Sequence, residues 1–392
     1  MNEPSGAPAA PPAPAGEVSI VRVRVSELED FARRNGEEAG RGGVVAISPE
    51  RARAQARNPY ADPDDVALVA AYVDGRCEGY VGVLPGLMWD GARTRKVNSI
   101  TTWYASPEMR GKKVGFRVLD AAREAGYDLF TTVFTESAAR VLRTSMREMP
   151  ALTYRLVDLR RGAPWSLVFR KLSGTGEGTL PRVERGVFRP ARAVLLALLA
   201  ARYAGAAARL RAEEVRQLDE ADFAPLEADP TPRFVRGAPV VNWMLANPWI
   251  TETPPPPDDP WRGYYFSRTR PLFRYAAWRF HDERGGRAGF AVVSVTDQNG
   301  QRSVRLLDHE LRAPADPDAL LGLVLQYARR WGADVLVLPE SMAPALRGPV
   351  WRLLSRPAVR PYFCSLREPE GDMAGLLGRL RLDRCDCDVA FI

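Results

Sequence analysis

The sequence predicts a mixed α/β fold made of two tandem units that share one architecture. Segments rich in β-branched and aromatic residues alternate with segments whose apolar residues recur at helical spacing. Residues 122–130 (AREAGYDLF) also return as residues 328–336 (ARRWGADVL). Each copy has the end of a helix, a glycine that permits the left-handed conformation beyond it, and the start of a strand. The recurrence indicates a duplicated unit.

The first unit is expected to fold within residues 17–170. Residues 1–16 are rich in Pro, Ala and Gly, so they cannot offset their ordering entropy by burial and should form a disordered tail. Asp74-Gly75 is a hairpin-turn sequence that favours antiparallel pairing of the strands on either side. The patterns give strands at 18–25, 66–73, 78–84, 96–104, 128–134 and 152–158, and helices near 26–35, 49–57, 113–125 and 137–146.

The second unit is expected within residues 236–392. Its first hairpin carries Gly289-Phe290 where the first unit carries Gly79-Tyr80, which extends the internal similarity. The patterns give a helix at 317–331 and strands near 275–281, 288–295, 302–309, 334–338 and 360–366.

A linker, residues 171–235, joins the units and should contain a helix. Residues 189–218 are rich in Ala, Leu and Arg and have no proline after Pro190, which favours a helix. The apolar run at 193–201 is much shorter than the roughly 20 residues that span a bilayer. We expect this helix to pack on the two units. The alternative is peripheral contact of an Arg-rich helix with an anionic membrane through its leucine face.

Residues 106–115 (SPEMRGKKVG) lie between an apolar strand and a patterned helix. A helix that starts after such a turn presents unpaired N–H groups and the positive end of its dipole, which together favour a bound phosphate. Arg110, Lys112 and Lys113 add positive charge at the same place. The sequence therefore predicts a phosphate site here, with a basic surface turn before an ordinary helix as the alternative.

This segment resembles the R/Q-x-x-G-x-G/A pyrophosphate loop of the GNAT superfamily of acyl-CoA-dependent N-acyltransferases. The order of the predicted elements is also the one that the GNAT fold requires, although Lys113 stands where the family usually has glycine. The resemblance implies two tandem GNAT-like domains joined by the helical linker, and a site for acetyl-CoA or another acyl-CoA. The backbone of the strand before the loop would pair with pantetheine. The residues implied for the cofactor are Trp103, Tyr104, Ala105, Arg110, Gly111, Lys112, Lys113, Val114 and Gly115.

The second copy lacks this loop. Residues 311–318 (LRAPADPD) place the carboxylates of Asp316 and Asp318 where phosphates would bind. Like charges a few ångströms apart repel by about 1 kcal/mol or more, even with surface screening. We therefore expect one acyl-CoA site, in the first unit, and a degenerate second unit that borders the substrate cleft.

The resemblance also implies where the chemistry takes place. The strand at 129–135 would diverge from the strand before the loop and leave a cleft, in which an amine attacks the thioester with help from a base and an acid. The family's frequent tyrosine acid falls on Arg143. Glu136 and Ser137 stand at a helix start, so capping is the alternative for both. The candidate catalytic residues are Glu136 as base, directly or through water, Ser137 beside it, and Tyr104 or Tyr154 as proton donor.

Other chemistry-bearing residues have structural interpretations. Asp90, in Trp89-Asp90-Gly91, could contact substrate, but Asp-Gly is first a turn signal. His281 and His309 are expected to be hydrogen-bonded structural residues. The pair Cys385 and Cys387 has no second thiol pair or nearby histidine, so we expect no metal site. A group of aromatic residues should form core between the units, with an acyl or acceptor pocket as the alternative: Trp243, Trp249, Trp261, Tyr264, Tyr265 and Phe266.

Composition limits the classes of partner. A net charge of +7 suits an anionic cofactor or a membrane surface, and no nucleic-acid signature accompanies it. Four cysteines are too few for a disulfide framework and no signal peptide is evident, so a reducing cytoplasm is the default expectation.

The resemblance thus implies an N-acyltransferase, first of all an acetyltransferase, that acts on an amine of a small molecule or amino sugar by direct attack in a ternary complex. Two alternatives stay open. An aminoacyl-tRNA-dependent peptidyltransferase of the same doubled fold would need a basic groove for tRNA. A GNAT-like scaffold or sensor would bind CoA without turnover, which the missing tyrosine favours.

Overall fold

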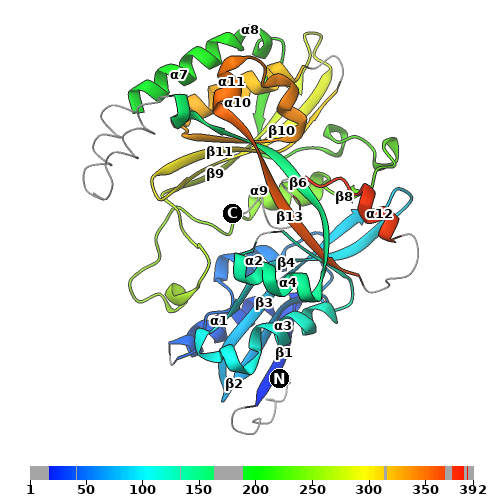
Figure 1. Cartoon of the computed structure of the whole chain (residues 1–392), viewed down its shortest axis with the longest axis vertical. Helices are drawn as coiled ribbons and strands as arrows, with labels where there is room; N and C mark the ends of the chain where they lie inside the picture. The colour runs from blue at the N-terminus through cyan, green and yellow to red at the C-terminus, as the bar shows by residue number, and fades with distance from the viewer. Residues whose placement is uncertain are drawn as a thin grey trace, which may run out of the picture.

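The computed structural model describes residues 17–40, 42–132, 134–162, 189–312, 316–366, 373–383 and 386. The predicted tail at 1–16 lies outside these residues, as do Cys385 and Cys387. Figure 1 shows an N-terminal half, blue to cyan, and a C-terminal half, green to orange, with the long strands β6 (Arg147–Asp158) and β13 (Ser355–Ser365) crossing between them.

A mixed sheet of 13 strands runs through both halves, which confirms the predicted α/β class. Its order is β1-β2-β3-β4-β5-β13-β6-β12-β11-β10-β9-β7, and β8 pairs with β3. The other strands of the N-terminal half are β1 (Val18–Arg24), β2 (Val66–Val73), β3 (Arg76–Trp89), β4 (Thr94–Ala105), β5 (Asp128–Thr131) and β8 (Arg233–Phe234). Those of the C-terminal half are β7 (Arg211–Val215), β9 (Leu272–His281), β10 (Arg287–Gln298), β11 (Gln301–Leu311) and β12 (Val335–Pro339).

Helices cover both faces of the sheet in the N-terminal half. Successive residues of β2 point to opposite faces: Leu68 packs in a core with α1, and Val69 packs in a core with α3. The predicted turn joins β2 to β3, with φ of 50° at Asp74 and 76° at Gly75, the left-handed backbone that a two-residue hairpin requires. The helices of this half are α1 (Leu28–Ala39), α2 (Pro49–Ala56), α3 (Val114–Arg123) and α4 (Glu136–Ser145).

The C-terminal half repeats this order of elements. Its hairpin β10–β11 is followed by α10 (Pro317–Trp331), which has the predicted bounds, and then by β12. Gly332 ends α10 in the left-handed conformation, as the internal repeat predicts. Gly289 lies opposite Leu311 at the end of β11, just as Gly79 lies opposite Ala105 at the end of β4. Helices α9 (Ala238–Ala246) and α11 (Pro349–Leu354) also belong to this half, whereas α12 (Met373–Arg379) packs in a core with β6 and β8.

The two halves exchange their last strands. β13, from the end of the chain, lies between β5 and β6, where Phe363 pairs with Thr131 on one side and with Glu148 on the other. The other edge of β6 pairs with β12, through Leu336 and Val157. Each half of the sheet therefore contains a strand that belongs, in sequence, to the other half.

The predicted long helix at 189–218 is wrong in its second part. The segment forms α7 (Arg189–Arg202) and α8 (Ala204–Ala207) and then the edge strand β7, which pairs with β9. Leu196 and Leu199 of α7 are buried in the C-terminal core, whereas Val194 and Leu198 on the opposite face are 60% and 65% exposed. The leucine face thus packs on the protein. Within the described residues, no helix is both long enough and apolar enough to cross a bilayer.

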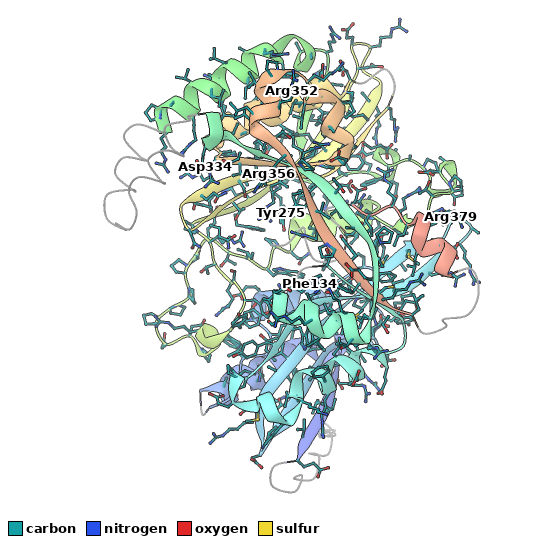
Figure 2. All side chains as sticks on the ribbon, in the orientation of Figure 1. Phe134, Tyr275, Asp334, Arg352, Arg356 and Arg379 are labelled. Atoms are coloured by element: carbon teal, nitrogen blue, oxygen red, sulfur yellow. The ribbon has the colours of Figure 1, made fainter. Side chains whose placement is uncertain are left out.

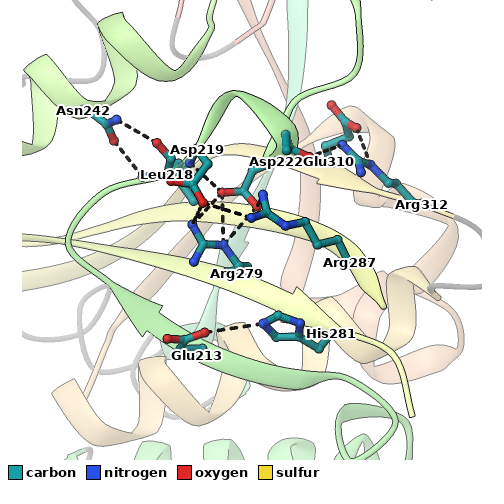
Figure 3. A network of polar contacts seen from close by, with 11 residues as sticks. Glu213, Leu218, Asp219, Asp222, Asn242, Arg279, His281, Arg287, Glu310 and Arg312 are labelled. Atoms are coloured by element: carbon teal, nitrogen blue, oxygen red, sulfur yellow. Dashed lines mark hydrogen bonds and ion pairs between the residues drawn. The ribbon is translucent and has the colours of Figure 1, made fainter. Parts of the chain in front are cut away.

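Ion pairs fix the segment after β7 to the C-terminal half (Figure 3). Asp222, which is 1% exposed, accepts hydrogen bonds from Arg279 Nε at 3.0 Å and from Arg287 Nη1 at 2.9 Å. Asp219 accepts from the same two guanidinium groups. His281 lies 3.4 Å from Glu213 at the neighbouring edge, consistent with its predicted structural role.

Candidate functional site

Strands β4 and β5 diverge in the N-terminal half. Their parallel pairing covers only Val97 with Asp128 to Ser99 with Phe130. Beyond Ser99 the paired edge of β4 faces β3, while β5 turns its other edge to β13. This opening, which the resemblance to the GNAT loop implies, leaves the far edge of residues 100–105 available to a bound molecule.

The predicted phosphate loop leads directly into α3. The first backbone bond of the helix ladder runs from Arg117 N–H to Lys113 O at 3.0 Å, so the amides of Val114, Gly115 and Phe116 precede the ladder. The indole N–H of Trp103 donates to Gly115 O at 3.1 Å and ties the helix start to β4. A cavity of about 230 Å³ lies at this corner, bordered by the loop, by the end of β4 and by the first turn of α3.

Lys113 adopts a left-handed backbone, with φ of 56° and ψ of 27°. This conformation costs a residue with a Cβ roughly 1–2 kcal/mol, whereas glycine adopts it freely. The side chains of Lys112 and Lys113 are exposed, and Lys113 borders the smaller cavity. The Arg110 side chain lies outside what the structure describes.

A larger cavity of about 780 Å³ shares Trp103, Ala105 and Gly115 with the smaller one. It is bordered by β4, the start of α3, the end of β5, the start of α4, α2 and the segment 265–270 of the C-terminal half. Because α2 and α3 lie on opposite faces of the sheet, the cavity passes through the gap between β4 and β5. The two halves thus share one cleft.

Aromatic and apolar side chains form much of the wall. The rings of Tyr104 and Tyr265 lie 4.7 Å apart, and Phe134 packs edge-on against Phe363 of β13, where the halves meet (Figure 2). Burial, with smaller effects from Glu108 and Tyr265, raises the pKa of Tyr104 above its usual 10.0. The Tyr104 hydroxyl therefore keeps its proton at neutral pH.

The segment that carries Tyr265 is tied to α2. Arg268 donates to Glu50 from Nη2 at 3.1 Å and from Nε at 3.3 Å, and it also binds Asp259. Burial alone would raise the pKa of Glu50, but the hydrogen bond and charge of Arg268 outweigh it and the pKa is lowered. The cleft is consequently closed on this side by a fixed segment.

The predicted catalytic residues are only partly brought together. Tyr104 and Ser137 line the larger cavity, whereas Glu136 and Tyr154 do not. The Glu136 side chain is 73% exposed and lies 3.9 Å from Arg143. Neither Glu136 nor Ser137 caps α4, because Thr135 accepts the hydrogen bond from Ala138 N–H, and Ser137 Oγ lies 2.9 Å from Thr135 Oγ1.

Asp90 stabilises the turn in which it lies. Its carboxylate accepts hydrogen bonds from the amides of Ala92 and Arg93 and from Arg95 Nε. Burial would raise its pKa, but these bonds hold the pKa at about 2. These contacts account for Asp90 as a turn residue.

The C-terminal copy presents acidic groups at the corresponding helix start. The Asp316 carboxylate caps α10 by accepting from Asp318 N–H at 2.9 Å.

His309 lies 3.2 Å from Ser341 Oγ, and burial lowers its pKa to about 4. Neither histidine lines the larger cavity, and no cluster of metal-ligating side chains occurs among the residues that the structure describes.

The aromatic group is divided between core and cleft. Trp243 and Trp249 are buried between the halves, and Trp243 donates to Ala54 O of α2 at 2.7 Å. Tyr265 and Phe266 instead line the larger cavity. The predicted core role thus holds for Trp243 and Trp249, and an acyl or acceptor pocket at Tyr265 and Phe266 stays a prediction.

Two arginines of the cavity wall, Arg51 of α2 and Arg270 of the 265–270 segment, carry no functional signal in the sequence. Both belong to arginine-rich stretches that are typical of ordinary solvated surface. Only their burial in the folded chain sets them apart.

No protein-family model matches the sequence, and no curated protein matches it. A GCN5-related N-acetyltransferase from Anabaena variabilis is similar in structure, with a TM-score of 0.48 and 9% identity over 89% of this chain and 73% of that chain. A tandem GNAT protein from the clavulanic acid biosynthesis pathway has a TM-score of 0.44 and 13% identity over 91% and 100%. Saccharomyces cerevisiae N-myristoyltransferase with bound myristoyl-CoA has a TM-score of 0.45 and 10% identity over 91% and 80%.

Proposed function

We propose that the chain is a GNAT-type N-acyltransferase that binds acyl-CoA in the N-terminal half and transfers the acyl group to an amine. The observation that carries the proposal is the position of the α3 amides. They open on a cavity that continues through the gap between β4 and β5. A diphosphate held at the α3 amides would place the pantetheine arm toward this gap.

The protein groups have separate tasks in this proposal. The amides of Val114, Gly115 and Phe116 would hold the diphosphate with help from Lys112 and Lys113. The free edge of β4 at 103–105 would hydrogen-bond the pantetheine amides, as an added strand would. The acyl-CoA itself supplies an activated thioester carbonyl.

Proton transfer would involve the cleft side of β4 and α4. Tyr104 lines the cavity and stays protonated, so its hydroxyl can donate a proton to the leaving thiolate. Ser137 could orient the acceptor amine. Glu136 would act as base only through water, because its carboxylate is outside the cavity lining and beside Arg143.

One observation favours a second function, that of a CoA-binding scaffold or sensor without turnover. Among the described residues that line the larger cavity there is no Asp, Glu or His. An amine would have to lose its proton to water or before binding. Release of CoA thiol from acetyl-CoA, measured with a panel of small amines, separates the enzyme from the scaffold.

The phosphate site is tested by reversing its charge. In the Lys112→Glu/Lys113→Glu double variant we expect calorimetry to show acetyl-CoA bound at least about tenfold more weakly, since two attractions become repulsions. Acyl-CoAs with longer chains, tested alongside, would give the depth of the acyl pocket.

The matched control is Arg33→Glu/Arg34→Glu on α1, which changes the net charge equally on an exposed surface away from the cavity. Its affinity for acetyl-CoA should stay close to that of the unmodified protein. Equal weakening in both double variants would show that only net charge matters, and it would remove the assignment of the phosphate site.

A further inference from the structure

Two buried arginines in the wall of the larger cavity have no acidic partner. Arg51 is 3% exposed and Arg270 is 8% exposed, and both line the cavity. Neither forms an ion pair with any residue in the described part of the chain. Arg51 Nη1 and Arg270 Nε are also without a hydrogen-bond partner there. Two arginines without an acidic partner thus line the same cavity.

The protein holds both guanidinium groups in place by other means. Arg51 stacks on the ring of Trp249, 4.3 Å from its centroid. Arg270 donates from Nη1 to Thr296 Oγ1 at 2.7 Å, and its backbone N–H donates to Thr251 O. The segment 249–251 thus contacts the Arg51 side chain through Trp249 and the Arg270 backbone through Thr251, and the two arginines come one from each half of the molecule.

This arrangement is unfavourable unless an anion binds. A buried charge that lacks a partner costs several kcal/mol relative to water. Burial also lowers the pKa of Arg270, in keeping with that cost. The nearby Arg268 shows the usual solution, because it binds both Glu50 and Asp259. In contrast to Arg268, Arg51 and Arg270 have no carboxylate partner among the described residues.

The position of the pair favours the acceptor over the donor. The phosphate corner lies at α3, on one face of the sheet, whereas Arg51 is on α2, on the other face. A donor held at α3 would reach the gap between β4 and β5 from its own side. The arginines face the part of the cleft beyond that gap.

We propose that Arg51 and Arg270 bind a carboxylate of the amine acceptor, so that the acceptor is an amino acid or another amine that carries a free carboxylate. This inference rests on the proposed acyltransferase function. The planar guanidinium matches a carboxylate through paired hydrogen bonds, which gives direction as well as charge. Thr101 and Ser267 in the same wall offer hydroxyl groups to the same ligand.

The binding test compares acids with amides. Full-length protein saturated with CoA is titrated with the standard α-amino acids and with their α-amides. We expect at least one acid to bind about tenfold or more tightly than its amide, and Arg51→Gln or Arg270→Gln to remove that preference. Arg51→Lys and Arg270→Lys keep the charge without the planar group and should give intermediate affinity.

Arg274→Gln is the matched control. Arg274 lies near the same segment but is exposed, pairs with Glu252 and does not line the cavity. It should leave the preference for acids intact. Equal loss in this control, or acids and amides that bind alike, would overturn the inference.

A stability measurement provides an independent readout. Because each glutamine variant removes an uncompensated buried charge, its midpoint of thermal unfolding without ligand should equal or exceed that of the unmodified protein. A large decrease in both variants, with unchanged ligand binding by the lysine variants, would show that the arginines are structural.

Further binding experiments identify whether the acceptor or the acyl group carries the carboxylate. If succinyl-CoA binds more tightly than acetyl-CoA and the arginine variants remove that gain, the carboxylate belongs to the acyl group and the acceptor assignment is wrong. Binding of inorganic phosphate but of no amino acid also overturns it. Absence of CoA binding, with acids still bound at the arginines, would reject the acyltransferase proposal and keep the carboxylate site.

Discussion

Residues 106–115 resemble the GNAT pyrophosphate loop, which usually has glycine where this chain has Lys113. The backbone conformation of Lys113 gives a physical reason for that glycine. The chain turns there through a left-handed conformation before α3 begins, and a Cβ makes that conformation unfavourable. Lys113 keeps the turn and adds a charge beside the cavity corner. The departure from the family pattern thus changes the strain of the loop rather than its path.

Lys113→Gly should relieve this strain. We expect the free energy of unfolding in urea to rise by about 0.5–1 kcal/mol, the left-handed cost less the added entropy of glycine in the unfolded chain. Lys112→Gly is the control, because Lys112 is not among the residues with positive φ and should lose stability. A destabilised Lys113→Gly would contradict a left-handed backbone at this residue.

The loop at 106–115 could be predicted because its signals are local, a strand end, glycines and a helix start. The roles of Arg51 and Arg270 could not, because the absence of a partner is a property of the folded chain. Glu136 was placed at the start of α4 by its sequence, but the extended backbone that caps the helix falls on Thr135. Glu136 therefore lies in the first turn of α4, and its carboxylate points to solvent.

At the scale of elements, apolar periodicity predicted β2 and α10 with their observed bounds. Apolar periodicity does not predict a strand that forms by pairing with a sheet edge rather than by burial. β7 (Arg211–Val215) has charged, mostly exposed side chains and a composition typical of helix, yet it adds to the edge of β9. β5 ends at Thr131, short of the predicted 134, because the chain leaves the sheet at the cleft.

The Asp222 network is predicted to stabilise this edge of the C-terminal half. Asp222→Asn should lower the free energy of unfolding at pH 7 by about 1.5–3 kcal/mol, the range for buried hydrogen bonds to a charged group. Glu283→Gln, at an exposed position of the neighbouring turn, should change it little. Urea denaturation measures both, and equal effects would show that Asp222 has no special role.

The same network gives a pH dependence. Burial would raise the pKa of Asp222, but the hydrogen bonds from Arg279 and from the Asp219 amide, with the charges of Arg279 and Arg287, lower it overall. A lowered pKa means stabilisation that is present above the unfolded-state value of about 3.9 and is lost as pH falls through the folded-state value. Asp222→Asn should therefore lose less stability between neutral and acidic pH than the unmodified protein.

At the scale of the whole molecule, the sequence predicts two units in succession, and the structure joins them through β6 and β13. Strand composition does not specify which of several similar strands become neighbours, so this exchange was not predictable. It has a functional consequence, because the cleft includes the segment 265–270 of the C-terminal half, and β13 pairs with β5 beside it.

Phe363→Ala tests this dependence. Phe363 belongs to the C-terminal strand β13 but is fully buried in the N-terminal core, so its loss should cost about 3–5 kcal/mol and speed hydrogen exchange of β5. Val359→Ala, on the same strand but 64% exposed, should have little effect. Faster exchange confined to the C-terminal half would contradict the exchanged strands.

The most direct measurement is a crystal structure of the full chain with acetyl-CoA bound. The proposed site requires diphosphate oxygens within hydrogen-bond distance of the Val114, Gly115 and Phe116 amides, and pantetheine along the free edge of β4. A diphosphate bound elsewhere, with this corner filled by the protein's own side chains, would contradict it.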